Sequence, residues 1–252
     1  MKVMVCVTQV LEVSAYLEFT ADGTSIDPAF VTGALNEADQ NAIQEALTLR
    51  EADGPGEVVL VSFGADDAES ALRAGLVMGA DRAVRIAGEG LELADTRTVA
   101  KALAQVVAAE QPDLVLTGVQ AADTGSQSTG PATAEAWGVP WIPVARSLSV
   151  DNGTLTATRE FEAGVSETVK VALPALATIQ VGANEPRYGS FKDKMRAKKA
   201  EIPVIEPAGL PEPRTRLIKM TAAQPGGRSV EMVQGGPAAI ASRILEIVRE
   251  VR

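Results

Sequence analysis

The residues best suited to binding chemistry lie in one segment, 117–131, with the sequence TGVQAADTGSQSTGP. The segment follows an apolar run and precedes an alanine-rich one, so we expect it to connect a buried strand to a helix. Ligands of open α/β sheets bind at the carboxyl ends of such strands. Glycines allow a close approach of the backbone, and amides at a helix N-terminus favour an anion. The segment therefore predicts a phosphate site, with hydroxyl donors at Thr124, Ser126, Ser128 and Thr129.

A simpler interpretation of the same segment is a helix start that is capped by Ser or Thr and preceded by flexible glycines. Neither the lysine-containing phosphate loop GxxxxGK[ST] nor the turn GxGxxG occurs in it. A phosphate site that lacks this lysine and a strong magnesium signature favours a nucleotide that is held rather than hydrolysed.

Two further segments are expected at the same edge of the sheet. Residues 36–39, with the sequence NEAD, open a helix, and an ordinary N-cap with an acidic partner is the simpler interpretation of them. Phe63 ends a strand just before Gly64. Its ring could flank a nucleobase or belong to the core.

The composition excludes several kinds of active site. The 252 residues include no His and one Cys, so no His-dependent nucleophile, metal site or internal disulfide is expected. A net charge of −10 argues against binding to nucleic acid or an anionic membrane, since both need clustered Lys and Arg. No apolar run approaches the roughly 18 residues of a membrane-spanning helix, and no signal-peptide pattern opens the chain. We therefore expect a cytoplasmic protein with no nucleic-acid partner and no direct membrane insertion.

Strand and helix patterns alternate through the first three quarters of the chain. Apolar runs predict strands, and apolar residues at helical spacing predict helices. The predicted strands cover 3–10, 58–63, 83–86 and 114–117, and the predicted helices cover 36–50, 68–78 and 96–109. This alternation predicts an α/β fold with a three-layer, doubly wound, mostly parallel sheet.

Two regions depart from this alternation. Residues 16–26 contain an Asp-Gly pair, which predicts a small hairpin. After Pro140, the runs SLSV, TLTATREFE and ETVKVAL alternate polar and apolar residues as antiparallel strands do. Residues 174–181 predict a further apolar strand. We therefore expect antiparallel additions to the sheet.

The last part of the chain differs in composition from the rest. Residues 187–199 contain six basic residues and one acid. A proline-rich stretch, IPVIEPAGLPEP, follows and predicts an extended arm. Residues 237–251 then place apolar side chains on one helical stripe, which must be buried on its own domain or on a partner. These patterns predict a nucleotide-binding domain at 1–205 and a C-terminal arm with an amphipathic helix at 206–252.

Several segments of the chain, in the same order, resemble those of the beta subunit of electron-transfer flavoproteins. The segments are MKVMVCV, LNEADQNAIQEALTLRE, LRAGLVMGADRAVRI, GVQAADTGSQSTG, ATREFEAGVSETVKVALPALATIQ and NEPRYGSFKDKMRAKKAEI. The resemblance is close over residues 1–205 and loose in the tail. It implies the smaller subunit of a heterodimer whose alpha subunit holds most of an FAD, and it implies AMP as a structural ligand of this chain. The arm and terminal helix would then dock on the alpha subunit.

By position, the resemblance implies an AMP-binding shell drawn from four segments. Cys6 on the first strand would be a wall of the pocket, since an apolar strand raises rather than lowers a thiol pKa. Residues 126–130 would supply the phosphate donors. The implied shell consists of Cys6, Asn36, Glu37, Ala38, Asp39, Phe63, Asp123, Thr124, Gly125, Ser126, Gln127, Ser128, Thr129, Gly130 and Thr133.

The resemblance also implies protein partners. Residues 184–199 are similar to the recognition loop with which the family anchors to dehydrogenases, and Phe191 stands where relatives place an apolar anchor. A solvated basic helix face is the simpler interpretation of this segment. The implied partners are the alpha subunit, a flavin dehydrogenase as electron donor, and a quinone oxidoreductase or similar acceptor. The implied partner-binding residues are Glu185, Pro186, Arg187, Tyr188, Phe191 and Met195.

The chain departs from the family in places that bear on its function. Relatives usually carry Lys or Arg where this chain has Thr8-Gln9, and the aromatic that approaches the flavin is displaced to Tyr16 or absent. Some relatives bind a second FAD in place of AMP and bifurcate electrons, commonly with DGDTAQ in the phosphate loop. The sequence DTGSQ at 123–127 favours AMP. We therefore expect an electron-carrier subunit without catalytic turnover and without catalytic residues; a bifurcating beta subunit and a free-standing nucleotide-binding stress-type protein are the alternatives.

Overall fold

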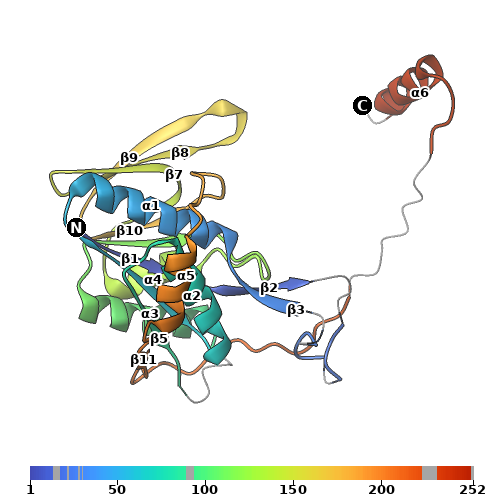
Figure 1. Ribbon diagram of the computed structural model, residues 1–252. Helices are drawn as coiled ribbons and strands as arrows, with labels where there is room; N and C mark the ends of the chain where they lie inside the picture. Colours follow the sequence, from blue (N-terminus) through green and yellow to red (C-terminus); the bar gives the residue numbers. More distant parts are fainter. Residues whose placement is uncertain are drawn as a thin grey trace. The chain divides into compact units, whose positions relative to one another are not determined.

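The apolar runs of the sequence form the parallel centre of a nine-stranded sheet (Figure 1). The interior residues of these strands are buried, because helices cover both faces. Strands of this kind need no polar alternation. The central strands are β1 (Lys2–Cys6), β4 (Glu57–Phe63), β5 (Arg82–Ile86), β6 (Leu114–Gly118) and β10 (Ala175–Ile179).

The computed structural model describes residues 1–13, 18–21, 23–27, 29, 31–88, 94–222 and 232–250. The chain divides into two units, Met1–Met220 and Thr221–Arg252. The sheet belongs to the first unit. Helix α6 (Pro237–Glu250) belongs to the second.

Helices cover the sheet from two sides, and the predicted three-layer α/β fold is confirmed. One side carries α1 (Glu37–Asp53), α2 (Glu69–Met78), which the short 3-10 helix η2 (Asp66–Ala68) precedes, and α5 (Phe191–Lys199). The other side carries α3 (Thr96–Glu110) and α4 (Thr129–Trp137). Each helical layer has its own apolar cluster against the sheet. Ile43 and Leu72 are fully buried in the first cluster, and Leu103 and Val107 lie in the second.

The strand order places a topological switch point between β1 and β6. The order across the sheet is β11-β5-β4-β1-β6-β10-β7-β8-β9. From β1 the chain proceeds through β4 to β5 on one side, and α3 then returns it to β6 on the other side of β1. Open α/β sheets bind ligands outside the carboxyl ends of the strands at such a point.

Three strands continue the sheet beyond β10, and the predicted antiparallel additions are confirmed. They are β7 (Trp141–Asp151), β8 (Thr154–Glu160) and β9 (Ser166–Ala172), with the 3-10 helix η4 (Glu162–Gly164) before β9. β7 pairs parallel with β10, whereas β8 pairs antiparallel with both of its neighbours. The β7–β8 turn uses Asn152 and Gly153, both at positive φ. This is the type I′ pattern, which matches the twist of the flanking strands.

The expected single strand at 3–10 is wrong. β1 ends at Cys6, and β2 (Gln9–Val13) turns away to pair with β3 (Val31–Leu35) in a separate ribbon. The interruption coincides with a contact to a residue distant in sequence, because the amide of Thr8 donates to the carboxylate of Asp39 instead of to a strand neighbour.

The hairpin expected at 16–26 is described only in part. Phe19 and Ile26 form an antiparallel bridge. Tyr16 and Asp22 lie outside the described residues.

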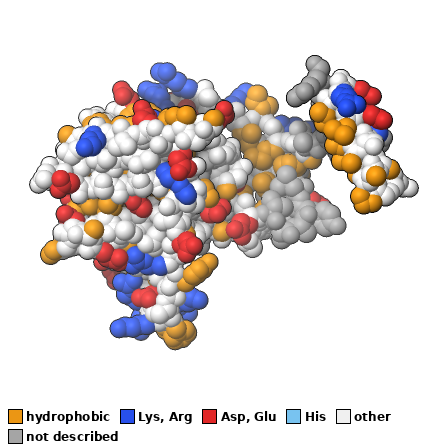
Figure 2. Space-filling view, turned by 90° about the horizontal axis from the view of Figure 1, so that it is seen from above, with side chains coloured by type: hydrophobic (Ala, Val, Ile, Leu, Met, Phe, Trp, Pro, Cys, Tyr) orange, Lys and Arg blue, Asp and Glu red, His pale blue; other side chains and the backbone are white. Residues whose placement is uncertain are grey.

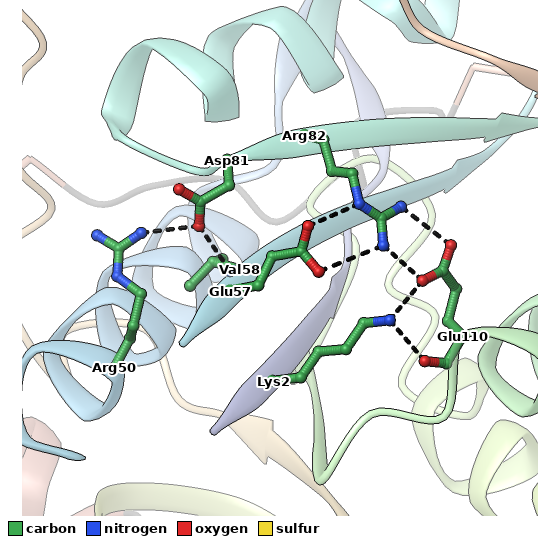
Figure 3. A network of polar contacts seen from close by, with 7 residues as sticks. All are labelled: Lys2, Arg50, Glu57, Val58, Asp81, Arg82 and Glu110. Atoms are coloured by element: carbon green, nitrogen blue, oxygen red, sulfur yellow. Dashed lines mark hydrogen bonds and ion pairs between the residues drawn. The ribbon is translucent and has the colours of Figure 1, made fainter. Parts of the chain in front are cut away.

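An ion-pair network ties together the amino ends of the central strands (Figure 3). Arg82 on β5 binds Glu57 on β4, and it also binds Glu110 at the end of α3. Lys2 on β1 binds Glu110 as well. The network therefore joins three strands and one helix at the edge of the sheet opposite the switch point.

Beyond α5 the chain is extended, as its prolines predict. The short strand β11 (Val204–Ile205) pairs parallel with β5. In the second unit, Figure 2 shows the apolar side chains of α6 gathered on one side of the helix, and Ile244, Leu245 and Val248 are about half exposed. The predicted amphipathic helix is confirmed. Among the described helices, none has both the length and the apolar character needed to cross a membrane.

Candidate functional site

A cavity of about 490 Å³ lies at the switch point. Its walls come from the carboxyl ends of β1, β4 and β6, the first turns of α1, α3 and α4, the loop that joins β6 to α4, and Thr215 of the C-terminal arm. Small-molecule sites usually have volumes of roughly 300–1,000 Å³. The cavity therefore has the size and the position of a ligand site in a doubly wound fold.

Asp39 of α1 holds the two strand ends at the switch point. Its buried carboxylate accepts the backbone amide of Gly118, at the end of β6, at 2.9 Å and the amide of Thr8, just after β1, at 2.8 Å. Burial raises the pKa of Asp39 to about 7, and the two amide donors oppose that rise. One side chain thus sets the positions of both strand ends.

Asn36 joins the start of α1 to the loop that follows β6. Its Nδ2 donates to the carbonyl oxygen of Gln120 at 2.8 Å, and its Oδ1 accepts the amide of Ala122 at 3.2 Å. Asn36 is buried, as Asp39 is. The side chains of both residues are therefore engaged within the chain, where they position the loop.

The loop between β6 and α4 is folded onto itself. The amide of Ala121 donates to the carbonyl of Ser126, and the amide of Gly125 donates to the carbonyl of Ala121. Gly125 has φ +69°, which residues with a side chain rarely adopt. The side-chain amide of Gln127 donates to that of Gln120 at 3.1 Å. The loop is therefore preformed, and it presents Ser126 and Gln127 to the cavity.

Three of the described helices begin at the cavity, and their first turns differ in charge. α1 has Glu37 and Asp39 in its first turn. α3 is capped by Asp95, whose carboxylate accepts the amide of Thr98 at 2.9 Å. α4 has no acid in its first turn, and Ser128 makes no capping hydrogen bond. An anion in the cavity is therefore favoured at α4 and disfavoured at the other two helix starts.

The α4 end of the cavity offers neutral hydrogen-bond donors. Within the described part of the chain, the backbone amides of residues 127–130 have no acceptor. Helix N-termini of this kind bind phosphate groups. No Lys or Arg is found among the described residues that line the cavity. The donor set thus fits a phosphate held by amides and hydroxyls.

Another part of the cavity wall is apolar. Cys6, Phe63, Val99 and Leu103 contribute to its wall. Burial, with a smaller contribution from the charge of Asp39, raises the pKa of the Cys6 thiol to about 12. The thiol is therefore protonated at neutral pH, and Cys6 acts as a wall residue. Such a surface suits the flat face of a nucleobase.

Most residues of the implied AMP shell are brought together here. Those that line the cavity are Cys6, Asn36, Asp39, Phe63, Asp123, Thr124, Ser126, Gln127, Thr129 and Gly130. The remaining ones lie in the same segments but do not line it: Glu37, Ala38, Gly125, Ser128 and Thr133. Glu37 is exposed, and Thr133 is buried with its hydroxyl donating to the carbonyl of Thr129 at 2.7 Å.

Sequence reasoning missed several lining residues outside the segment 117–131: Thr8, Asp95, Thr96, Val99, Leu103 and Thr215. A signal for the start of α3 was available, because Asp95 is a favoured N-cap residue directly before the predicted helix at 96–109. No local signal marks Thr215, since its position depends on the path of the arm across α3.

The segment at 184–199, which is predicted to bind a partner, exposes apolar side chains on and just before α5, the helix that packs against α2. Phe191 is 78% exposed and Met195 is 42% exposed, and Tyr188 is fully exposed. Phe191 and Met195 are four residues apart on α5, so they share one face of the helix. Ser190 and Asp193 form a capping box that fixes the start of this helix.

Arg187, in the same segment, is fastened to α1. Its guanidinium donates to Glu51 at 2.6 and 3.2 Å and to Gln44 at 3.0 Å. The hydrogen bonds with Glu51 raise the pKa of Arg187 and lower the pKa of Glu51. Glu185 is exposed and Pro186 is half-buried. Arg187 therefore anchors the segment to its own domain.

The fold and the cavity together define a class: an α/β protein with the architecture that binds nucleotides at a switch point. The family model described as electron transfer flavoprotein domain matches residues 26–210. The chain is 35% identical to the electron transfer flavoprotein subunit beta of Bradyrhizobium diazoefficiens, over 97% of both chains. The chain is 33% identical to the electron transfer flavoprotein subunit beta of Methylophilus methylotrophus, over all of this chain and 99% of the relative. It is also 33% identical to the subunit beta of Homo sapiens, over 83% of both chains. The chain therefore belongs to the electron transfer flavoprotein family, among its beta subunits.

Proposed function

We propose that this chain is the beta subunit of a heterodimeric electron transfer flavoprotein and that it holds AMP in the cavity at the switch point. The family match and the relatives support the first part. The free amides of residues 127–130 beside the cavity carry the second part. Neutral donors hold a phosphate without promoting its hydrolysis, and the described lining residues include no lysine that would stabilise a leaving group.

Different residues of the cavity would bind different parts of AMP. The start of α4, with Ser126 and Thr129, would hold the phosphate. The apolar wall around Phe63 would hold the base. Asn36 and Asp39 would act indirectly, since their side chains fix the loop and the strand ends.

The alpha subunit would hold most of an FAD, which supplies the electron-transfer chemistry. This chain would act as a carrier subunit without turnover of its own. The domain at 1–205 would hold AMP, and the part at 206–252 would dock on the alpha subunit. The half-exposed stripe of Ile244, Leu245 and Val248 supports this docking, because an apolar face of this kind needs a partner.

A flavin dehydrogenase would dock on the exposed face of α5. Phe191 and Met195 are apolar groups that can enter a pocket of the partner, and lysines of the same helix would attract an acidic rim. Electrons would pass from the dehydrogenase to the FAD and then to a quinone oxidoreductase or similar acceptor.

The AMP proposal is tested by the nucleotide content of the purified heterodimer. Denaturation and chromatography should release one AMP and one FAD for each heterodimer. Ser126→Glu places a carboxylate in the cavity and should reduce the AMP content strongly. Ser149→Glu adds the same charge on the exposed surface of β7 and should leave the AMP content unchanged.

The same measurement separates the alternatives. Two FAD and no AMP would favour a bifurcating beta subunit, and reaction with NADH would then be expected. A chain that holds a nucleotide but forms no complex with an FAD-bearing subunit would favour a free-standing protein. Either result would contradict the proposal.

The docking proposal is tested by Phe191→Ala. Loss of an aromatic anchor that docking would bury should slow electron transfer from the dehydrogenase about tenfold or more, while flavin and AMP contents stay unchanged. Phe161→Ala removes an equally large, half-exposed ring from the β8–β9 connection and serves as the matched control. Equal rates for the two variants would refute the role of α5.

A further inference from the structure

The C-terminal arm is fastened along α3. Gln105 and the backbone of Ala208 exchange two hydrogen bonds, at 2.8 and 3.3 Å. Nearer the start of α3, the hydroxyl of Thr98 donates to the carbonyl of Pro211 at 3.1 Å. In Figure 1 the arm is the orange segment that continues beyond β11. As the residue numbers of the arm rise, those of its partners on α3 fall, so the arm runs antiparallel to the helix toward the cavity.

The arm reaches the cavity at the start of α3. Asp95 Oδ2 accepts the amide of Arg214 at 2.7 Å, while Asp95 Oδ1 caps the helix through the amide of Thr98. The Arg214 amide is the largest of the contributions that lower the pKa of Asp95 to about 2, so the carboxylate is charged at neutral pH. The next residue, Thr215, lines the cavity.

The arm also contributes to the apolar packing beside the cavity. Leu210 packs against the same cluster as Phe63 and Val99. Phe63, Val99 and Leu103 in turn line the cavity. The arm is therefore built into the wall of the cavity at the start of α3.

We infer that residues 211–215 form a strap that closes the nucleotide cavity and that Asp95 is the residue that positions this strap. The identity of the ligand rests on the proposed function. A nucleoside held against Phe63, Val99 and Leu103 would lie in the same cavity that Thr215 of the strap lines. Release of AMP then requires the strap to leave Asp95, so this contact sets the release rate.

A matched pair of substitutions tests the role of the contact. Arg214→Pro removes the larger of the two contributions that strap amides, those of Arg214 and Thr215, make to Asp95, because proline has no backbone N–H. Arg214→Ala removes the side chain and keeps that amide. Asp95→Ser is a second, independent variant: serine still caps α3 but has no second oxygen for the strap.

The experiment uses the full chain in complex with its alpha subunit. The complex is loaded with radiolabelled AMP and chased with an excess of unlabelled AMP. Arg214→Pro and Asp95→Ser should release AMP about tenfold faster, since each loses a hydrogen bond to a charged group. Arg214→Ala should stay within twofold of the unmodified complex. Melting temperatures and FAD contents are measured in parallel and should stay unchanged.

The outcomes separate the strap from the proposed function. Release of AMP at one common rate from all four complexes would overturn the strap. Faster release accompanied by a matching loss of melting temperature and FAD would also overturn it, because the contact would then be merely structural. An unmodified complex that contains no AMP would overturn the proposed function itself.

Discussion

Asp39 and Gly118 approach each other so closely that only glycine can occupy the second position. Asp39 Oδ1 accepts the amide of Gly118 at 2.9 Å, and a Cβ added to Gly118 would lie 2.4 Å from the same oxygen and 2.7 Å from the Cβ of Ala38. The contact joins the first turn of α1 to the carboxyl end of β6. It therefore fixes the point from which the loop at 119–128 leaves the sheet.

Gly118→Ala should separate α1 from β6. Overpacking of a tight contact costs about 1–3 kcal/mol, and we expect that loss in the free energy of unfolding measured with urea. The AMP content should fall as well, because the loop moves with the strand end. Gly236→Ala is the control, since a Cβ at Gly236 meets nothing within 4 Å. Equal stability of the two variants would contradict the tight contact.

The stability of the domain should depend on pH through Asp39. Burial raises its pKa from 3.8 to about 7 in the folded protein, so the folded state binds this proton more tightly than the unfolded chain. The stabilisation that comes from tighter binding of this proton in the folded state is present in full below about pH 4, and it is lost as the pH rises through about 7. As the pH rises from about 4 to about 7, the free energy of unfolding should therefore decrease relative to that of Asp39→Asn, whose side chain does not titrate.

Urea unfolding of both proteins at several pH values between 5 and 8 checks this dependence. Glu37→Gln removes an exposed carboxylate from the same turn and should show the pH dependence of the unmodified protein. A constant difference between the unmodified protein and Asp39→Asn over this range would contradict the prediction.

The contribution of Glu110 to stability should depend on pH in the opposite sense to that of Asp39. Its hydrogen bonds with Arg82 lower its pKa from 4.5 to about 2, with a further contribution from Lys2 (Figure 3). The stability from this pair is present above about pH 4.5 and is lost as the pH falls through about 2. Glu110→Gln should cost about 1 kcal/mol at neutral pH, and this difference should vanish at acid pH. Acid unfolding compared with Glu135→Gln, on the exposed side of α4, checks the prediction.

Arg187 and Glu51 should be energetically coupled. Their exposed ion pair is bidentate, and Gln44 adds a third hydrogen bond to the same guanidinium. We expect a coupling of about 0.5–1 kcal/mol in a double-mutant cycle of Arg187→Ala with Glu51→Gln. A cycle that pairs Lys192→Ala with Glu51→Gln is the control, with an expected coupling near zero. Similar coupling energies in both cycles would show that Glu51 responds to the overall basic charge of the segment and not to its ion pair with Arg187.

Arg187→Ala should also affect docking. The segment between β10 and α5 would lose its attachment to α1, and Phe191 would be presented less precisely. Electron transfer from the dehydrogenase should slow, but less than in Phe191→Ala, because the anchor itself remains. A larger effect than that of Phe191→Ala would mean that Arg187 contacts the partner directly.

Local sequence patterns were enough to predict those strands and turns whose physical cause also lies within a few residues. Continuous apolar runs predict buried parallel strands because both faces of such strands are covered, and the strands at 58–63 and 114–117 follow this rule. The Asn152-Gly153 turn is predictable since both residues tolerate positive φ. The loop between β6 and α4 could be located for the same reason: its glycines and hydroxyls follow a strand and precede a helix.

Residues that depend on distant partners could not be assigned in this way. The interruption of the expected strand at 3–10 comes from Asp39, which captures the amide of Thr8. Asn36 and Asp39 were expected as ligand residues, and the structure engages their side chains with the backbone of the loop and of the strand ends. No spacing in the sequence distinguishes a side chain that faces a ligand from one that faces a neighbouring loop.

The amino-acid sequence by itself determined the layers of this protein and the loop at the edge of the sheet, because periodicity and turn chemistry act over a few residues. The family was indicated by the resemblance of several segments in the same order. The tertiary structure alone decided that Thr215 and Cys6 line the same cavity, and that Arg187 is bound to Glu51. These pairs are brought together by the crossing of whole elements, whose relative positions depend on the packing of the entire core.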